Sequence, residues 1–257
     1  MKKNPKGKSN PVHLGNHTEK VSIVIPFYNC RYVDMALMSA LRQTYKNTEI
    51  IVVDDGSTEH VEKLSPFMNM KKIIYTKKTN GGTATALNEG IKRANGSYFA
   101  WLSSDDLLHP SKIEMQLNFM KQQKALFSFT NFNWINENNT PIKLSVSPKY
   151  PDKVSFCKDM KKRCPINGST VMINMNIFSD VGPFDETMIY THDYDLWNRI
   201  ILKYDMPFLD RPLTSYRVHR DMGTRKYTQE INKEVDIIQK RYSKKLDQFI
   251  AKVTSGI

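Results

Sequence analysis

Two adjacent carboxylates, Asp105 and Asp106, are separated by only two serines from an apolar run, residues 99–102, that has the length and composition of a buried strand. Residues 110–124 have helical spacing, so both carboxylates fall at the C-terminal end of the expected strand. In an open α/β sheet, ligands bind at this edge. Two hard oxygen ligands suit Mg²⁺ or Mn²⁺ held against a diphosphate, which supplies further ligands itself. The alternative for this pair is an ordinary helix N-cap.

Two more buried strands precede this one, at residues 21–25 and 49–53. The helical spacing between them predicts a right-handed parallel crossover. The first strand is expected to end at Pro26, and the second runs into Asp55. Three strand ends, at Pro26, Asp55 and Asp105, therefore meet at one edge of the sheet. This convergence favours a nucleotide site more strongly than any one of the three ends.

A glycine turn, Asn80-Gly81-Gly82, lies between a short strand at residues 73–75 and a helix expected over residues 83–94. Glycine allows positive φ at such a turn, and the backbone amides could approach a phosphate at the helix N-terminus. The same three residues are also typical of a plain turn, so the motif alone is weak.

A second acidic pair, Asp193 and Asp195, opens a helix expected to run to Leu202. An acidic residue at a helix start is favoured by the helix dipole, and simple capping describes Asp195 better than Asp193. Farther on, the alternation of the strand at residues 213–219 puts Arg217 and His219 on the same face. Both side chains suit a diphosphate or its metal, although a lone His on a strand is more often a core residue.

At 257 residues the chain could form one large α/β domain or two small ones, and we favour one domain with a helical tail. Of the 257 residues, 40% are hydrophobic, which is enough for a sizeable core. We expect a flexible basic arm over residues 1–20, the domain over 21–224 and an amphipathic basic helix over 225–257. Residues 136–165 show weak periodicity and are expected to be irregular. The C-terminal helix either packs on the domain or lies with its basic face near membrane lipid.

A net charge of +12 favours polyanionic partners: nucleic acid, an anionic membrane surface or phosphorylated substrates. The three cysteines form no metal or redox motif, and no apolar run resembles a signal peptide or a spanning helix. We therefore expect a cytoplasmic protein in a reducing compartment, with possible peripheral attachment to a membrane by charge.

In order and spacing, several motifs across residues 21–222 resemble the family-2 glycosyltransferases of the GT-A fold. These motifs are VSIVIPFYN at 21–29, VVDDGS at 52–57, NGG at 80–82, ALNEGI at 86–91, SSDD at 103–106, HDYDLW at 192–197 and YRVH at 216–219. The resemblance implies a mostly parallel sheet flanked by helices. It also implies metal-dependent, inverting transfer of a sugar from a nucleotide-diphosphate sugar, here expected to be a UDP-sugar, in cell-surface polysaccharide synthesis. The implied acceptor is a glycan or a lipid-linked sugar.

The resemblance also assigns roles to residues. Asp193 matches the catalytic base, Asp106 and His219 are the expected ligands of Mn²⁺ or Mg²⁺, and Pro26 and Asp55 match positions that hold the base and ribose of the nucleotide. The full set of expected donor contacts is Pro26, Phe27, Tyr28, Asn29, Asp55, Gly82, Asn88, Ser104, Asp105 and Arg217. Three positions depart from the family pattern: Ser103 and His192 where the family often has acidic residues, and Leu87 where it often has Arg.

Chemistry argued from the residues agrees with these roles. Asp193 would take the proton of an acceptor hydroxyl as its oxygen attacks the anomeric carbon from the face opposite the leaving nucleotide. His192 is the rival base. A nucleotidyltransferase would use the same metal and diphosphate groups but would need no base near Asp193. A nucleic-acid-binding module would explain the charge, but the carboxylates at the strand ends repel a phosphate backbone, so we expect no nucleic-acid partner.

Overall fold

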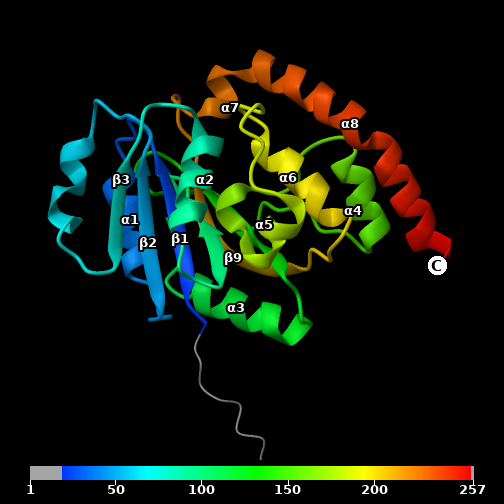
Figure 1. Cartoon of the computed structure of the whole chain (residues 1–257), viewed down its shortest axis with the longest axis horizontal. Helices are drawn as coiled ribbons and strands as arrows, with labels where there is room; N and C mark the ends of the chain where they lie inside the picture. The colour runs from blue at the N-terminus through cyan, green and yellow to red at the C-terminus, as the bar shows by residue number, and fades with distance from the viewer. Residues whose placement is uncertain (1–18, 256–257) are drawn as a thin grey trace, which may run out of the picture.

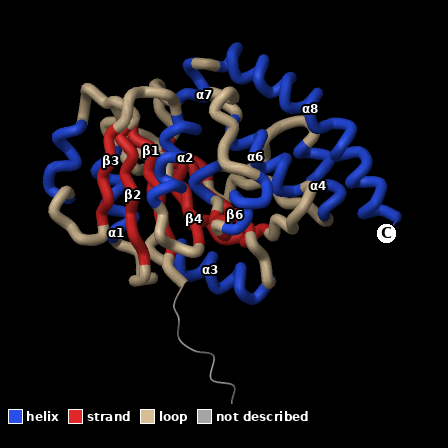
Figure 2. The backbone as a smooth tube through the Cα atoms, viewed as in Figure 1, coloured by secondary structure: helices blue, strands red, loops and turns tan. Residues whose placement is uncertain are grey.

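The first half of the sheet is parallel and follows the strand and helix alternation of the sequence. In the computed structural model, which describes residues 19–255, β1 (Val21–Phe27) lies between β2 (Thr48–Asp54) and β4 (Tyr98–Trp101), and β3 (Ile73–Lys77) pairs with β2. All three pairings are parallel. Figure 2 shows these strands running through the middle of the molecule with helices around them.

The second half of the sheet is mixed. β8 (Met172–Asn174) is antiparallel to β4 and to β6 (Phe127–Ile135), whereas β9 (Phe208–Arg217) runs parallel to β6. Two short strands, β5 (Leu107–Leu108) and β7 (Pro141–Lys143), pair antiparallel with β9 and β6. The predicted α/β fold is confirmed, and its parallel β-α-β part carries the three strand ends.

Helices cover both faces of the sheet because successive residues of each strand point to opposite sides. In β1, Val24 joins one core cluster and Ile23 joins the other. The Ile23 side is covered by α1 (Val33–Leu41) and α3 (Lys112–Gln123). The Val24 side is covered by α2 (Thr83–Arg93), α4 (Lys153–Met160), α5 (Asn176–Val181), α6 (His192–Ile201) and α8 (Thr228–Ser255).

The C-terminal helix packs on the domain, one of the two roles expected for it. α8 buries Ile238, Tyr242 and Leu246 in the same cluster as α6 and, as Figure 1 shows, runs along the outside of α6 and α4. It follows the short helix α7 (Gly223–Lys226). Among the described residues, no helix has the length and apolarity to cross a membrane. The expected N-terminal arm lies outside the described residues except for its last two positions.

Two local predictions need correction. β1 does not end at Pro26 but continues to Phe27, because β4 pairs with β1 only as far as Val24 and no ladder hydrogen bond is lost on that side. Residues 136–165 are not irregular throughout, because they contain β7 and α4. The N-cap residue of α4 is Asp152, whose carboxylate accepts a hydrogen bond from the amide of Ser155 at 2.7 Å. Two 3₁₀ helices, η1 (Val61–Phe67) and η2 (Gly168–Thr170), complete the described elements.

Candidate functional site

A cavity of about 990 Å³ opens where β1, β2 and β4 end. It brings together most of the side chains predicted from the sequence. The predicted residues that line it are Pro26, Phe27, Tyr28, Asn29, Asp55, Gly82, Ser104, Asp105, Asp193 and His219. Its volume is at the upper end of the range for small-molecule sites, so it has room for a donor and part of an acceptor.

Asp55 builds the glycine turn at one side of this cavity. Its carboxylate accepts hydrogen bonds from the amides of Gly81 (3.0 Å) and Gly82 (2.7 Å) and from the ammonium of Lys78 (2.6 Å). Gly82 has φ +89°, which favours glycine. The suggested phosphate cradle is therefore not supported, because Asp55 already occupies these two amides.

Asp105 and His219 face each other in the cavity. The Nε2 atom of His219 lies 3.0 Å from Oδ2 of Asp105, and their side chains are 8% and 25% exposed. The ring of Tyr32 packs edge-on against His219 at a centroid distance of 5.4 Å. These contacts bring together a carboxylate oxygen and an imidazole nitrogen from two distant parts of the chain.

Asp106, in contrast, points into the protein. It is 1% exposed and accepts hydrogen bonds from the hydroxyl of Ser169 (2.6 Å) and the amide of Arg217 (2.9 Å). Burial raises the pKa of Asp106 well above its ordinary value, and the neighbouring charge of Asp105 raises it further. Asp106 as a metal ligand stays a prediction, but both of its oxygens already have partners, and it does not line the cavity.

Two residues expected to contact the nucleotide sugar, Arg217 and Asn88, are instead hydrogen-bonded to other parts of the protein. The guanidinium of Arg217 is buried against backbone oxygens of Asp105, Asn136 and Glu137 at 2.7–3.2 Å. The amide of Asn88 is tied to the backbone of Phe184 at 2.9 and 3.0 Å. Neither side chain lines the cavity, so both stabilise loops near the site and are not available to a diphosphate.

In the second acidic pair, too, one carboxylate lines the cavity and the other is buried elsewhere. Asp193 lines the cavity from the first turn of α6 and accepts the amide of Tyr194 at 2.7 Å. Burial raises the pKa of Asp193, which makes its carboxylate a stronger base. Asp195 is buried away from the cavity, where it meets Arg199, Arg241 and the hydroxyl of Tyr242 at 2.7–2.8 Å. This agrees with helix geometry, because two residues of an α-helix are about 200° apart around its axis.

His192 has surroundings that disfavour its charge. It is 5% exposed, and its ring packs against those of Trp101 and Phe184, each at a centroid distance of 5.7 Å. Burial lowers the pKa of His192, so the imidazole is held neutral among aromatic rings.

One wall of this cavity was not predicted from the sequence. It comes from the loop before α6 and from the start of the C-terminal helices, and its rings of Tyr190 and Tyr227 stack at a centroid distance of 4.7 Å. Ile189 and Ile231 also line this wall. The only sequence signal was the closeness of Tyr190 to the His192-Asp193 motif.

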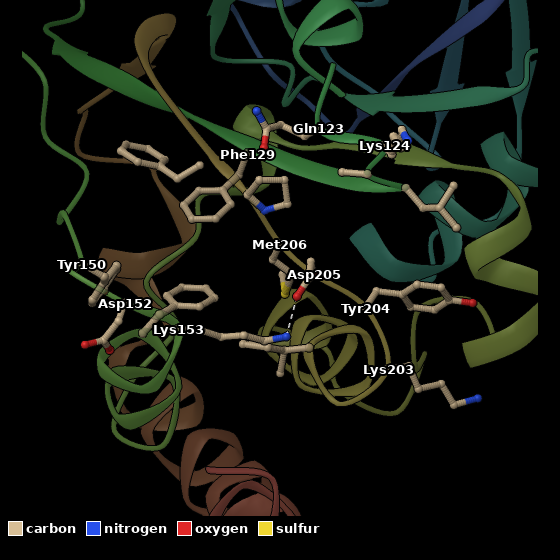
Figure 3. Close-up of a pocket in the computed structure, with 16 residues that line it drawn as sticks. Gln123, Lys124, Phe129, Tyr150, Asp152, Lys153, Lys203, Tyr204, Asp205 and Met206 are labelled. Carbon is tan, nitrogen blue, oxygen red and sulfur yellow. Dashed lines mark hydrogen bonds and ion pairs between the residues drawn. The ribbon is translucent and has the colours of Figure 1, made fainter. Parts of the chain in front are cut away.

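A second cavity of about 600 Å³ lies apart from these residues (Figure 3). Its lining includes Phe129, Phe156 and Phe208, and the ammonium of Lys153 meets Asp205 at 2.5 Å. None of the predicted site residues lines it. Chemistry is therefore assigned to the larger cavity at the strand ends.

The chain is similar to known proteins over much of its length. The family model described as Glycosyl transferase family 2 matches residues 22–182, a stretch that ends before Asp193 and His219. An uncharacterized glycosyltransferase of Rickettsia typhi is 40% identical over 205 residues, which are 77% of this chain and 64% of that relative. The chain thus spans less than two thirds of this relative's length.

A second relative has a more specific name. The UDP-Glc:alpha-D-GlcNAc-diphosphoundecaprenol beta-1,3-glucosyltransferase WfaP of Escherichia coli is 32% identical over 228 residues, which are 86% of each chain. Among solved structures, that of S. aureus TarS 1-349 in complex with UDP is similar with a TM-score of 0.66 and 18% identity. It covers 92% of this chain and 72% of the TarS chain, and at this identity the likeness shows the fold alone.

Proposed function

The chain belongs to glycosyl transferase family 2, and we propose that it transfers the sugar of a UDP-sugar, with inversion, to a hydroxyl of a lipid-linked sugar acceptor. The observation that carries the proposal is that one cavity contains both the Asp105–His219 pair and Asp193. The name of the WfaP relative, which contains a UDP-sugar and a diphosphoundecaprenol-linked acceptor, supports both substrate classes.

We propose Asp105 and His219 as the ligands of a divalent ion, Mn²⁺ or Mg²⁺. A carboxylate oxygen and an imidazole nitrogen 3.0 Å apart can turn toward one cation. Within residues 19–255, no group of three or more His, Cys, Asp or Glu side chains could hold a metal. Asp105 and His219 therefore fit an ion that takes its other ligands from the diphosphate and water. When bound, the ion would stabilise the charge that develops on the leaving diphosphate.

Asp193 is the proposed general base. Its carboxylate lines the cavity from a helix whose Leu196 and Trp197 are fully buried, so a rigid element holds it. It removes the proton of the acceptor hydroxyl while that oxygen attacks the anomeric carbon opposite the leaving nucleotide. A single displacement of this kind inverts the configuration of the transferred sugar.

The wall with Tyr190 and Tyr227 is the proposed acceptor side, because it lines the same cavity as Asp193 and consists of aromatic and aliphatic groups. The apolar C–H face of a sugar ring suits such a surface. Five lysines of α8 are exposed: Lys233, Lys240, Lys244, Lys245 and Lys252. Since the apolar face of α8 is used in packing, any contact with a membrane that carries the acceptor would be electrostatic.

One assay tests the proposed reaction. The protein is incubated with UDP-glucose, Mn²⁺ and a GlcNAc-diphospholipid, and the released nucleotide and the anomeric configuration of the product are measured. We expect release of UDP and an inverted linkage, both abolished by excess chelator. Release of pyrophosphate would instead indicate nucleotidyl transfer, and retained configuration would contradict Asp193 as a base in a single displacement.

A separate measurement tests the membrane contact. The protein should sediment with anionic vesicles at low salt and be released at high salt, because surface charges are screened over about 10 Å at 0.1 M salt. Binding that persists at high salt, or no binding at low salt, would contradict the electrostatic account.

A further inference from the structure

One carboxylate of the C-terminal helix accepts hydrogen bonds from the backbone amides of the loop that precedes the proposed base. Glu234 of α8 accepts hydrogen bonds from the amides of Ile189 (3.0 Å), Tyr190 (3.0 Å) and Thr191 (2.9 Å). It also accepts the hydroxyl of Thr191 at 2.8 Å. Four donors therefore converge on one side chain that lies more than forty residues away in the sequence.

These donors belong to the segment that leads into α6. Thr191 is the N-cap residue of that helix and makes no side-chain cap bond within it. The amides before a helix start need acceptors from elsewhere, and Glu234 supplies one for three consecutive residues. Because hydrogen bonds to a charged acceptor are about twice as strong as neutral ones, they fix the path of the chain just before His192 and Asp193.

A second contact between the same two helices lies on the other side of Asp193. Asp195 of α6 accepts hydrogen bonds from Arg241 (2.7 Å) and Tyr242 (2.8 Å) of α8. The chain is thus held to α8 both before and after the proposed base. Glu234 itself does not line the cavity, whereas Ile189, Tyr190 and Asp193 do.

We propose that Glu234 is a positioning residue for glycosyl transfer: it fixes residues 189–193 so that Asp193 and Tyr190 face the acceptor. This inference rests on the proposed function. It makes α8 part of the acceptor half of the active site rather than a packing tail. Misplacement of a reacting group by about 1 Å can cost about 10²-fold in rate, so loss of this anchor should affect turnover more than donor binding.

The discriminating variant is Glu234→Gln, which keeps the size of the side chain but puts an amide group among backbone donors. We expect kcat to fall by about tenfold to 10²-fold and the KM for the acceptor to rise. Binding of UDP with Mn²⁺ should stay within about twofold of the parent, because the strand ends are untouched. Glu234→Asp retains the charge and should recover part of the lost turnover.

The matched control is Asp236→Asn, which removes an exposed carboxylate of the same helix and should behave as the parent. Thermal unfolding is measured for every variant, with assays run well below the transition. Parental kcat in Glu234→Gln would overturn the inference. An equal loss of donor binding and turnover would also overturn it, because that result indicates general destabilisation.

Amide hydrogen exchange separates this inference from the proposed function. In Glu234→Gln, the amides of residues 189–191 should exchange faster than in the parent, while those of β1 and β2 stay protected. If the parent transfers no sugar, the proposed function fails, and the exchange measurement still tests the anchor. Unchanged protection of residues 189–191 would contradict the anchor whatever the activity.

Discussion

The molecule has two acidic pairs, one after β4 and one at the start of α6. In each pair, one carboxylate lines the larger cavity and the other is buried in the protein. Asp105 and Asp193 line the larger cavity, whereas Asp106 and Asp195 are each 1% exposed and bind other parts of the protein. In both pairs, therefore, one carboxylate is available for chemistry and its neighbour stabilises the walls.

The partners of the two buried carboxylates differ. Asp106 is held by neutral donors, the hydroxyl of Ser169 and the amide of Arg217, and burial raises its pKa. Asp195 is held by the guanidinium groups of Arg199 and Arg241. Asp106 thus joins the strand ends to β9 without a full countercharge, whereas Asp195 joins α6 to α8 through ion pairs. Closeness in sequence to a reactive carboxylate therefore does not indicate a reactive role.

The largest expected effect is on the reactive member of the second pair. Asp193→Asn is nearly isosteric but cannot take a proton, so the transfer rate should fall by about 10²- to 10⁴-fold. Binding of UDP with Mn²⁺ should be retained. His192→Asn should have a much smaller effect, because burial already disfavours a charged imidazole. Near-parental turnover in Asp193→Asn, with collapse in His192→Asn, would reassign the base to His192.

The roles of Asp105 and Asp106 can be distinguished by the metal-dependent binding of UDP, measured by calorimetry. Mutation of groups that only support metal ligands already costs about 10- to 100-fold in affinity, so Asp105→Asn, which removes a proposed ligand, should cost at least as much. Asp106→Asn should bind UDP and Mn²⁺ nearly as the parent does and should lose about 1–2 kcal/mol of stability instead. The reverse pattern would restore Asp106 as the metal ligand.

The buried member of the second pair should matter for stability. Asp195→Asn leaves Arg199 and Arg241 without their countercharge. Since these side chains are 21% and 36% exposed, we expect a loss of about 2 kcal/mol, less than for a fully buried pair. Urea unfolding measures this loss. Asp193→Asn is the control and should not be destabilised, because burial disfavours its ionised form. Equal loss in both variants would end the distinction between the two carboxylates.

The last prediction concerns the pH dependence of kcat. Burial raises the pKa of Asp193 above its ordinary value of 3.8, so the carboxylate protonates at a higher pH than an exposed one. Transfer needs the ionised form, and kcat should fall about tenfold per pH unit below that raised pKa. The pH profile of kcat is measured with donor saturating at each pH. An acid limb centred at or below 3.8 would contradict the burial of this base.

Several features of this protein could be predicted from local sequence. The apolar runs and helical spacing predicted β1, β2, β4, α2 and α6, because hydrophobic periodicity is a local property of the chain. Parallel crossovers then place all three strand ends at one edge. For this reason, the sequence predicted that Pro26, Asp55 and Asp105 would lie at the same cavity, which the structure confirms.

Only the tertiary structure decided which member of the first acidic pair faces the cavity. The partners of Asp106 lie 63 and 111 residues away in the sequence, and no local pattern indicates them. Similarly, Arg217 carried the right charge for a diphosphate, but its guanidinium is surrounded by backbone oxygens that only folding brings to it. Glu234 looked like one more polar residue of an amphipathic helix until the fold placed three backbone amides against it. A buried polar group must find partners, and the fold alone determines which ones are within reach.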